Sequence, residues 1–183
     1  MSELGNDFQI GAWAVAIIGG LITAWKAIAQ RQEDMRWKRA EMAKKCLDEI
    51  FGNHLAQAAM KMLDWDNLTY DIPGYGERGP ITTQARHVAL RTKGTVFYPK
   101  GDEQFIRDAF DALFDGLEML EHFLEIKLIE FADVKQPLSY YVGKLSKAEE
   151  YAAIQPFLTN YEFSKAEAFL RRYPKWRSNQ PIS

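Results

Sequence analysis

The stretch FQIGAWAVAIIGGLITAW, residues 8–25, most constrains this chain, because its only clearly polar side chains are Gln9 and Thr23. At a rise of 1.5 Å per residue, about 18 residues cover about 27 Å of helix, close to the roughly 30 Å hydrocarbon core of a bilayer. Trp25 lies where an aromatic interfacial anchor belongs. The sequence therefore predicts a transmembrane helix over residues 8–29, after a short extracytoplasmic segment of residues 1–7.

Charge on the two flanks of this segment predicts its orientation. Glu3 and Asp7 precede the segment, with no Lys or Arg before it. The residues that follow are basic, and we expect them to contact lipid headgroups: Lys26, Arg31, Arg36, Lys38 and Arg39. Positive charge stays in the cytoplasm, so we expect a single-pass protein of the cell inner membrane, with its N-terminus outside and its C-terminal domain inside.

Two other interpretations of the apolar segment remain open. Residues 27–29, Ala-Ile-Ala, resemble a signal-peptidase site, but a secretory signal has a positive start and this one is acidic. A buried core helix of a soluble protein is the second alternative, although so apolar and glycine-rich a terminal segment is unusual there.

Small and weakly polar residues line one face of the predicted span. An α-helix turns by 100° per residue, which places the small and weakly polar residues on one face and the bulky side chains on the opposite face. The residues of the small face are Gln9, Ala12, Ala16, Gly19, Gly20, Thr23, Ala27 and Gln30. Small residues let helix backbones approach closely in lipid, and a spacing of seven keeps residues 9, 16, 23 and 30 on one seam of a left-handed bundle. The stripe predicts self-association and a ring with a water-filled lumen, although chance composition also produces such stripes.

The rest of the chain predicts an all-α fold, in which the span continues into a cytoplasmic bundle of four to five helices. Residues 30–63 read as a basic juxtamembrane helix, with Gly52 its one weak point. Residues 64–101 read as a loop-rich segment with a short helix that Thr82 or Thr83 caps. Residues 102–174 complete the bundle, residues 175–183 form a tail, and no convincing alternating strand is visible.

The helix expected over residues 102–127 has an apolar stripe that includes Phe105, Leu113 and Leu117. Its other side is acidic, through Asp108, Asp111, Asp115, Glu118, Glu121 and Glu125. Such a charge run is usually a solvated face. It could also dock the basic segment of a neighbouring subunit.

Catalytic motifs are absent from the sequence. His54, His87 and His122 fit no zinc spacing, Cys46 stands alone, and no phosphate-binding glycine loop is present. We therefore predict no catalytic residue, no metal and no cofactor. Arg86, His87 and Arg91 lie within one or two helical turns and could contact phosphate or RNA.

Three segments carry a family resemblance: MLDWDNLTY at 62–70, FIRDAFDALFDGLEMLEHF at 105–123 and DVKQPLSYYVGKL at 133–145. With the terminal span, they resemble bacterial membrane-anchored helical domains. The architecture is also similar to that of the CRISPR-associated pore-forming membrane accessory proteins, which carry a HEPN-like bundle on a transmembrane helix. HEPN nucleases often carry Arg, four to six residues, then His, whereas here Arg86 directly precedes His87.

Three functional hypotheses follow. The first is a homo-oligomeric membrane protein, which the resemblance implies is a pore-forming effector or accessory in bacterial antiphage defence. The second is a membrane-tethered module that recruits a cytoplasmic protein or RNA partner. The third is a degenerate HEPN-type nuclease.

Overall fold

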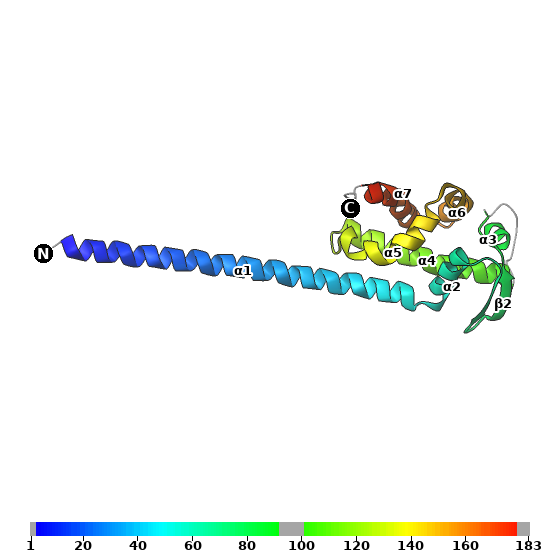
Figure 1. Cartoon of the computed structure of the whole chain (residues 1–183), viewed down its shortest axis with the longest axis horizontal. Coiled ribbons are helices and arrows are strands. Elements are labelled where there is room, and N and C mark those ends of the chain that lie inside the picture. Colours follow the sequence, from blue (N-terminus) through cyan, green and yellow to red (C-terminus); the bar gives the residue numbers. More distant parts are fainter. Residues whose placement is uncertain (1–2, 92–100, 179–183) are drawn as a thin grey trace. The chain divides into compact units, whose positions relative to one another are not determined.

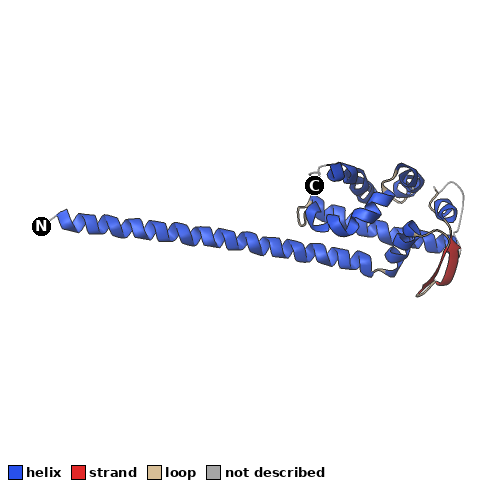
Figure 2. Cartoon of the chain, in the orientation of Figure 1, coloured by secondary structure: helices blue, strands red, loops and turns tan. Residues whose placement is uncertain are grey.

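A computed structural model describes the backbone of residues 3–91 and 101–178, and the side chains of residues 20, 21, 23–91 and 101–172. The chain is mostly helical, as predicted, and the one sheet in its described part has two strands (Figures 1 and 2). Residues 1–41 and residues 42–183 form two separate compact units.

The first helix, α1, spans Glu3–Gly52, and α2 spans His54–Asp64. The prediction of one unbroken helix as far as residue 63 was therefore wrong. Asn53 lies between the two helices with extended backbone, and its side-chain oxygen accepts hydrogen bonds from the backbone amides of Leu55 at 2.9 Å and Ala56 at 3.2 Å. An asparagine N-cap is among the most favourable ways to start a helix, and Gly52 is a poor helix former.

A β-hairpin occupies part of the segment that was expected to be a loop. Strand β1, Leu68–Ile72, pairs antiparallel with β2, Gly76–Ile81. The backbone of Gly79 has φ +110°, and an added Cβ there would lie 2.8 Å from the Leu68 carbonyl oxygen, so only glycine fits. The strands are short and mostly exposed, and for this reason the alternation of apolar residues did not stand out in the sequence.

Helix α4, Asp102–Glu125, is the centre of the second unit. Helices α2, α3 (Thr83–Ala89) and α7 (Ser164–Ser178) and strand β2 all pack against it (Figure 1). Phe114 lies in the middle, with its ring 6.1 Å from that of Phe157 and 5.5 Å from that of Phe163. Burying an aromatic side chain of this size stabilises a fold by about 1.5–3 kcal/mol, so this cluster is a main source of the domain's stability.

Helices α5 (Phe131–Leu145) and α6 (Ala148–Asn160) complete the domain. Helix α5 begins with a capping box between Glu130 and Asp133: the Glu130 amide donates to the Asp133 carboxylate at 2.9 Å. The helical domain thus includes α2 and α3 as well as the helices expected after residue 102.

The described side chains of α1 differ in burial along the helix. Ala43, Cys46 and Ile50 are buried in the core of the second unit, where the Ile50 side chain fills the space beside Gly116 of α4. A Cβ on Gly116 would lie 2.6 Å from Ile50 Cγ1, so α4 has a glycine where α1 crosses it. Burial raises the pKa of the Cys46 thiol, consistent with a small apolar core residue. In residues 20–41, by contrast, the described side chains are exposed, except for a half-buried Arg39.

Candidate functional site

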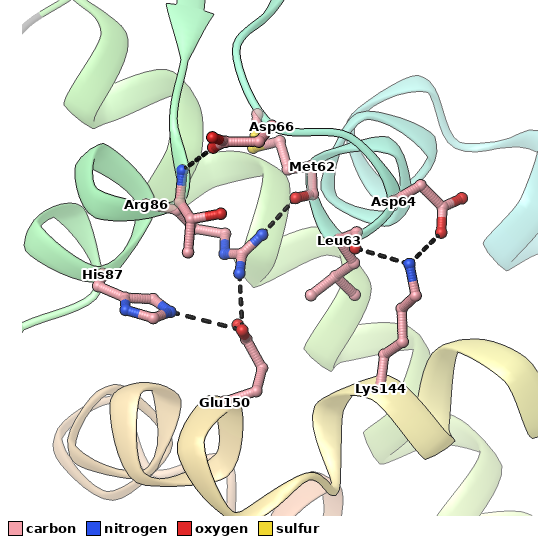
Figure 3. A network of polar contacts seen from close by, with 9 residues as sticks. Met62, Leu63, Asp64, Asp66, Arg86, His87, Lys144 and Glu150 are labelled. Carbon is pink, nitrogen blue, oxygen red and sulfur yellow. Dashed lines mark hydrogen bonds and ion pairs between the residues drawn. The ribbon is translucent and has the colours of Figure 1, made fainter.

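A buried polar cluster of the second unit surrounds Arg86 in α3. Arg86 is only 4% exposed, and its guanidinium donates to a Glu150 carboxylate oxygen of α6 at 2.6 Å and to the Met62 carbonyl of α2 (Figure 3). His87 Nε2 lies 3.4 Å from the same Glu150 oxygen. Thr82 positions these side chains, because its hydroxyl accepts from the Ala85 amide at 3.1 Å and starts α3. We call Arg86, His87, Glu150 and the Met62 carbonyl the Arg86 cluster.

A second cation binds the same end of α2. Lys144 of α5 donates to the Leu63 carbonyl at 2.8 Å and to the Asp64 carboxylate at 2.7 Å (Figure 3). Burial raises the pKa of Asp64, but hydrogen bonds from Lys144 and from tyrosines of α5 outweigh it and leave this pKa below its ordinary value. Burial lowers the pKa of Lys144, but the hydrogen bonds and charges of Asp64 and Tyr140 together outweigh it and leave that pKa raised. The two shifts agree that the pair is charged.

These contacts have the same physical cause, the unpaired carbonyl groups at the C-terminal end of α2. The last carbonyls of an α-helix have no partner within the helix, and the helix dipole places partial negative charge there. Arg86 and Lys144 satisfy two such carbonyls of α2, and Glu150 and Asp64 balance the two cations. The arrangement joins α2, α3, α5 and α6, and it directs both cations inward.

Tyr70 of β1 lies beside this polar region. Its ring packs 5.7 Å from that of Phe105, and it is buried. Burial raises the pKa of Tyr70 to about 12, with a smaller opposing effect of the Arg86 charge. The Tyr70 hydroxyl therefore stays protonated at neutral pH.

The structure separates the three residues predicted to contact phosphate. Arg86 points into the domain, His87 is half-buried beside Glu150, and the Arg91 guanidinium lies 3.4 Å from a Glu103 carboxylate oxygen. They do not form one exposed basic surface. Contact of His87 and Arg91 with RNA stays a prediction, whereas Arg86 is already engaged by Glu150.

The residues of the predicted assembly stripe and of the lipid contact lie in α1. The side chains of Gln9, Ala12, Ala16 and Gly19 lie outside the described residues. Gly20, Thr23, Ala27 and Gln30 are exposed, and so are Lys26, Arg31, Arg36 and Lys38. Arg39 is half-buried.

Across the described residues, no helix has both the length and the apolar character needed to cross a membrane. Residues 8–19 and 22 of the predicted span have side chains outside that description. Nor does any group of three or more His, Cys, Asp or Glu side chains in the described part form a cluster able to hold a metal ion.

Glu121 was wrongly assigned to the exposed acidic side of the helix over residues 102–127. It is 0% exposed, and the Arg172 guanidinium of α7 pairs with its carboxylate. Burial raises the pKa of Glu121, and Arg172 opposes this rise. A signal for its burial was present, because Glu121 follows Leu117 by four residues and therefore lies on the apolar stripe.

Sequence reasoning also missed the role of Arg107. Its guanidinium donates to the Tyr161 hydroxyl at 2.6 Å and lies 5.8 Å from the centre of the Phe157 ring. Nothing in the local sequence distinguishes this buried arginine from an exposed one.

Comparison with protein-family models, with curated proteins and with solved structures found no match to this chain. The resemblance to membrane-anchored HEPN-like domains stays a hypothesis.

Proposed function

We propose that this chain is a homo-oligomeric protein of the inner membrane. In this proposal α1 crosses the bilayer over residues 8–29 and assembles with copies of itself along the small-residue stripe, and the helical domain lies in the cytoplasm. The assembly forms a pore and acts as an effector or accessory. Its role in bacterial antiphage defence rests on the family resemblance alone.

The observation that carries this proposal is the exposure of large apolar side chains in α1. Leu21, Trp25 and Ile28 are 65%, 71% and 58% exposed within their own chain. Burying such side chains is worth about 1.5–3 kcal/mol each, so an external apolar partner is strongly favoured. A lipid bilayer is a suitable partner, because these residues continue the apolar sequence of residues 8–20 and basic residues follow them on one flank only.

The test is the oligomeric state of the full-length protein in detergent, measured by mass photometry. We expect Ala16→Leu and Gly20→Leu each to shift the oligomer towards monomer, because a larger side chain separates packed helices. Ala14→Leu is the matched control: it makes the same change on the opposite side of the helix and leaves the oligomer intact. A wild-type protein that is monomeric, or that stays in solution without detergent, would overturn the proposal.

A second candidate function, a membrane-tethered module that recruits a cytoplasmic partner, draws support from two exposed aromatics. Trp65 and Tyr140 are exposed, and both adjoin the Asp64–Lys144 pair: Trp65 follows Asp64, and Lys144 Nζ lies 4.7 Å from the Tyr140 ring centre. Replacing residues 8–29 with an unrelated monomeric span separates the two functions. Activity that survives this replacement favours the recruiting module, and lost activity favours the assembly.

A further inference from the structure

Trp37 is the most unusual exposed residue of α1 outside the predicted span. It is 71% exposed within its own chain, in a helical segment whose neighbouring residues are mostly charged. Its position also continues a series, because Gln9, Ala16, Thr23 and Gln30 recur every seven residues and Trp37 comes seven residues after Gln30. A seven-residue period keeps residues on the seam of a left-handed helical assembly.

Lipid reaches the Trp37 ring poorly, whereas the long cationic side chains beside it can extend back towards the headgroups. Trp37 lies eight positions beyond the end of the predicted span at residue 29, which corresponds to about 12 Å along a helix. The headgroup layer adds only about 5–8 Å beyond the hydrocarbon on each side. A large aromatic surface beyond that layer faces water unless protein covers it.

The charges beside Trp37 favour a second copy of the same helix. With Trp37 as the first position of a heptad, Arg36 occupies the position before it and Glu41 the fifth, and both are exposed. In parallel assembled helices these two flanking positions face each other across the interface, so Arg36 of one copy meets Glu41 of the next. The basic residues Arg31 and Lys38 follow the seam positions and point away from the seam.

We propose that the assembly seam of α1 extends beyond the membrane to Trp37, where parallel copies of this chain meet through Trp37 and pair Arg36 with Glu41 of the second copy. This inference rests on the proposed homo-oligomer, since it uses the same register. Ala40, three residues after Trp37, leaves room for a neighbouring indole ring. Glu33, four residues before it, lies on the same side, and a ring of helices with a hydrated lumen accommodates its charge.

Site-directed crosslinking tests the contact in the full-length protein in detergent, on a Cys46→Ala background that removes the one native thiol. We expect Trp37→Cys to crosslink between copies with a short bismaleimide. Met35→Cys is the matched control, because Met35 is similarly exposed at 62% but lies on the other side of the helix. Crosslinking several-fold higher at residue 37 supports the contact, and equal crosslinking at both positions, or none at residue 37, overturns it.

Charge reversal tests the pairing separately. Arg36→Glu and Glu41→Arg should each weaken the oligomer by about two- to fivefold in dissociation constant, the range expected for an exposed ion pair, and the double variant should restore it. Lys38→Glu, which points away from the seam, is the control and should have no effect. A double variant weaker than both singles contradicts the pairing.

The outcomes also distinguish this inference from the proposed function. A wild-type oligomer that Gly20→Leu dissociates, without preferential crosslinking at residue 37, refutes only the extension of the seam. A wild-type monomer refutes both.

Discussion

Residues 20–41 of α1 and the domain of residues 42–172 use similar apolar side chains in opposite ways. In the domain, Phe105, Phe110 and Phe114 are completely buried by neighbouring helices. In the N-terminal unit, Trp25 and Trp37 are both 71% exposed. Both regions are helical, so the difference lies in what covers the apolar surface and not in the tendency to form helix.

This contrast shows that the two regions are stabilised in different ways. The domain can bury its own apolar surface, because its short helices pack around α4. The N-terminal unit has a single helix to pack, and most helical stability in proteins comes from an apolar face buried against something else. Lipid and further copies of the chain are the proposed partners for that face.

The largest difference between the two regions is expected when the Phe114 ring is removed from the core of the domain. Phe114→Ala should lower the free energy of unfolding by about 3–5 kcal/mol, because the cavity would lie among several other aromatic rings. Denaturant unfolding of the domain, followed by near-ultraviolet circular dichroism, measures this loss. Trp25→Ala is the control and should change it little, and a comparable loss there would remove the distinction.

Variants of the Arg86 cluster test whether an ion pair stabilises the domain in addition to apolar packing. Arg86→Met should destabilise the domain by about 3 kcal/mol, because it leaves the half-buried Glu150 carboxylate without its cation. The same unfolding measurement applies. Adding Glu150→Leu should recover most of the loss, since an apolar pair can replace a buried ion pair. If the double variant is no more stable than the single one, the ion pair is not the cause.

Asp111 makes the stability of the domain depend on pH. Burial, with help from the nearby charges of Asp108 and Asp115, raises the pKa of Asp111 to about 6 from an ordinary 3.8. The folded state therefore binds this proton more tightly than the unfolded chain does, so stability increases as pH falls from about 7 to about 4 and declines as pH rises through about 6.

Asp111→Asn should remove this dependence and stabilise the domain at pH 7 by about 1 kcal/mol, a figure reduced for the partial exposure of the group. Unfolding curves between pH 4 and pH 7 measure both effects. Asp71→Asn, a change of the same charge on the exposed hairpin, is the control. An Asp111→Asn protein with the wild-type pH profile would show that another carboxyl group is responsible.

The smallest effect is expected at Trp37. Trp37→Ala should change the unfolding free energy of the domain by no more than about 0.5 kcal/mol, as for an exposed residue outside the core. Trp37→Ala should instead weaken the self-association of the chain. A large loss of domain stability would show that the two units depend on each other for folding.

The sequence predicted well those features that local residues determine. The helix expected over residues 102–127 was found at Asp102–Glu125, because its apolar residues repeat with helical spacing. Thr82 was confirmed as an N-cap, since a threonine hydroxyl satisfies a free amide of the first turn.

Features that depend on distant residues could not be predicted. Arg86 and Glu150 are 64 positions apart, and no local pattern connects them. Residues 68–81 lacked a clear strand signal because most of the hairpin faces solvent. Lys144 and Asp64 are separated by 80 positions in the same way, so the polar cluster at the end of α2 follows only from the fold.

The ion pair between Glu121 and Arg172 has a consequence for when the domain folds during translation. Glu121 of α4 is completely buried, and its cation comes from the last described helix. A nascent polypeptide still short of residue 172 lacks both this cation and part of the helix that packs on α4. Translation must therefore reach α7 before α4 can settle into its final environment, so this domain completes its folding late during synthesis.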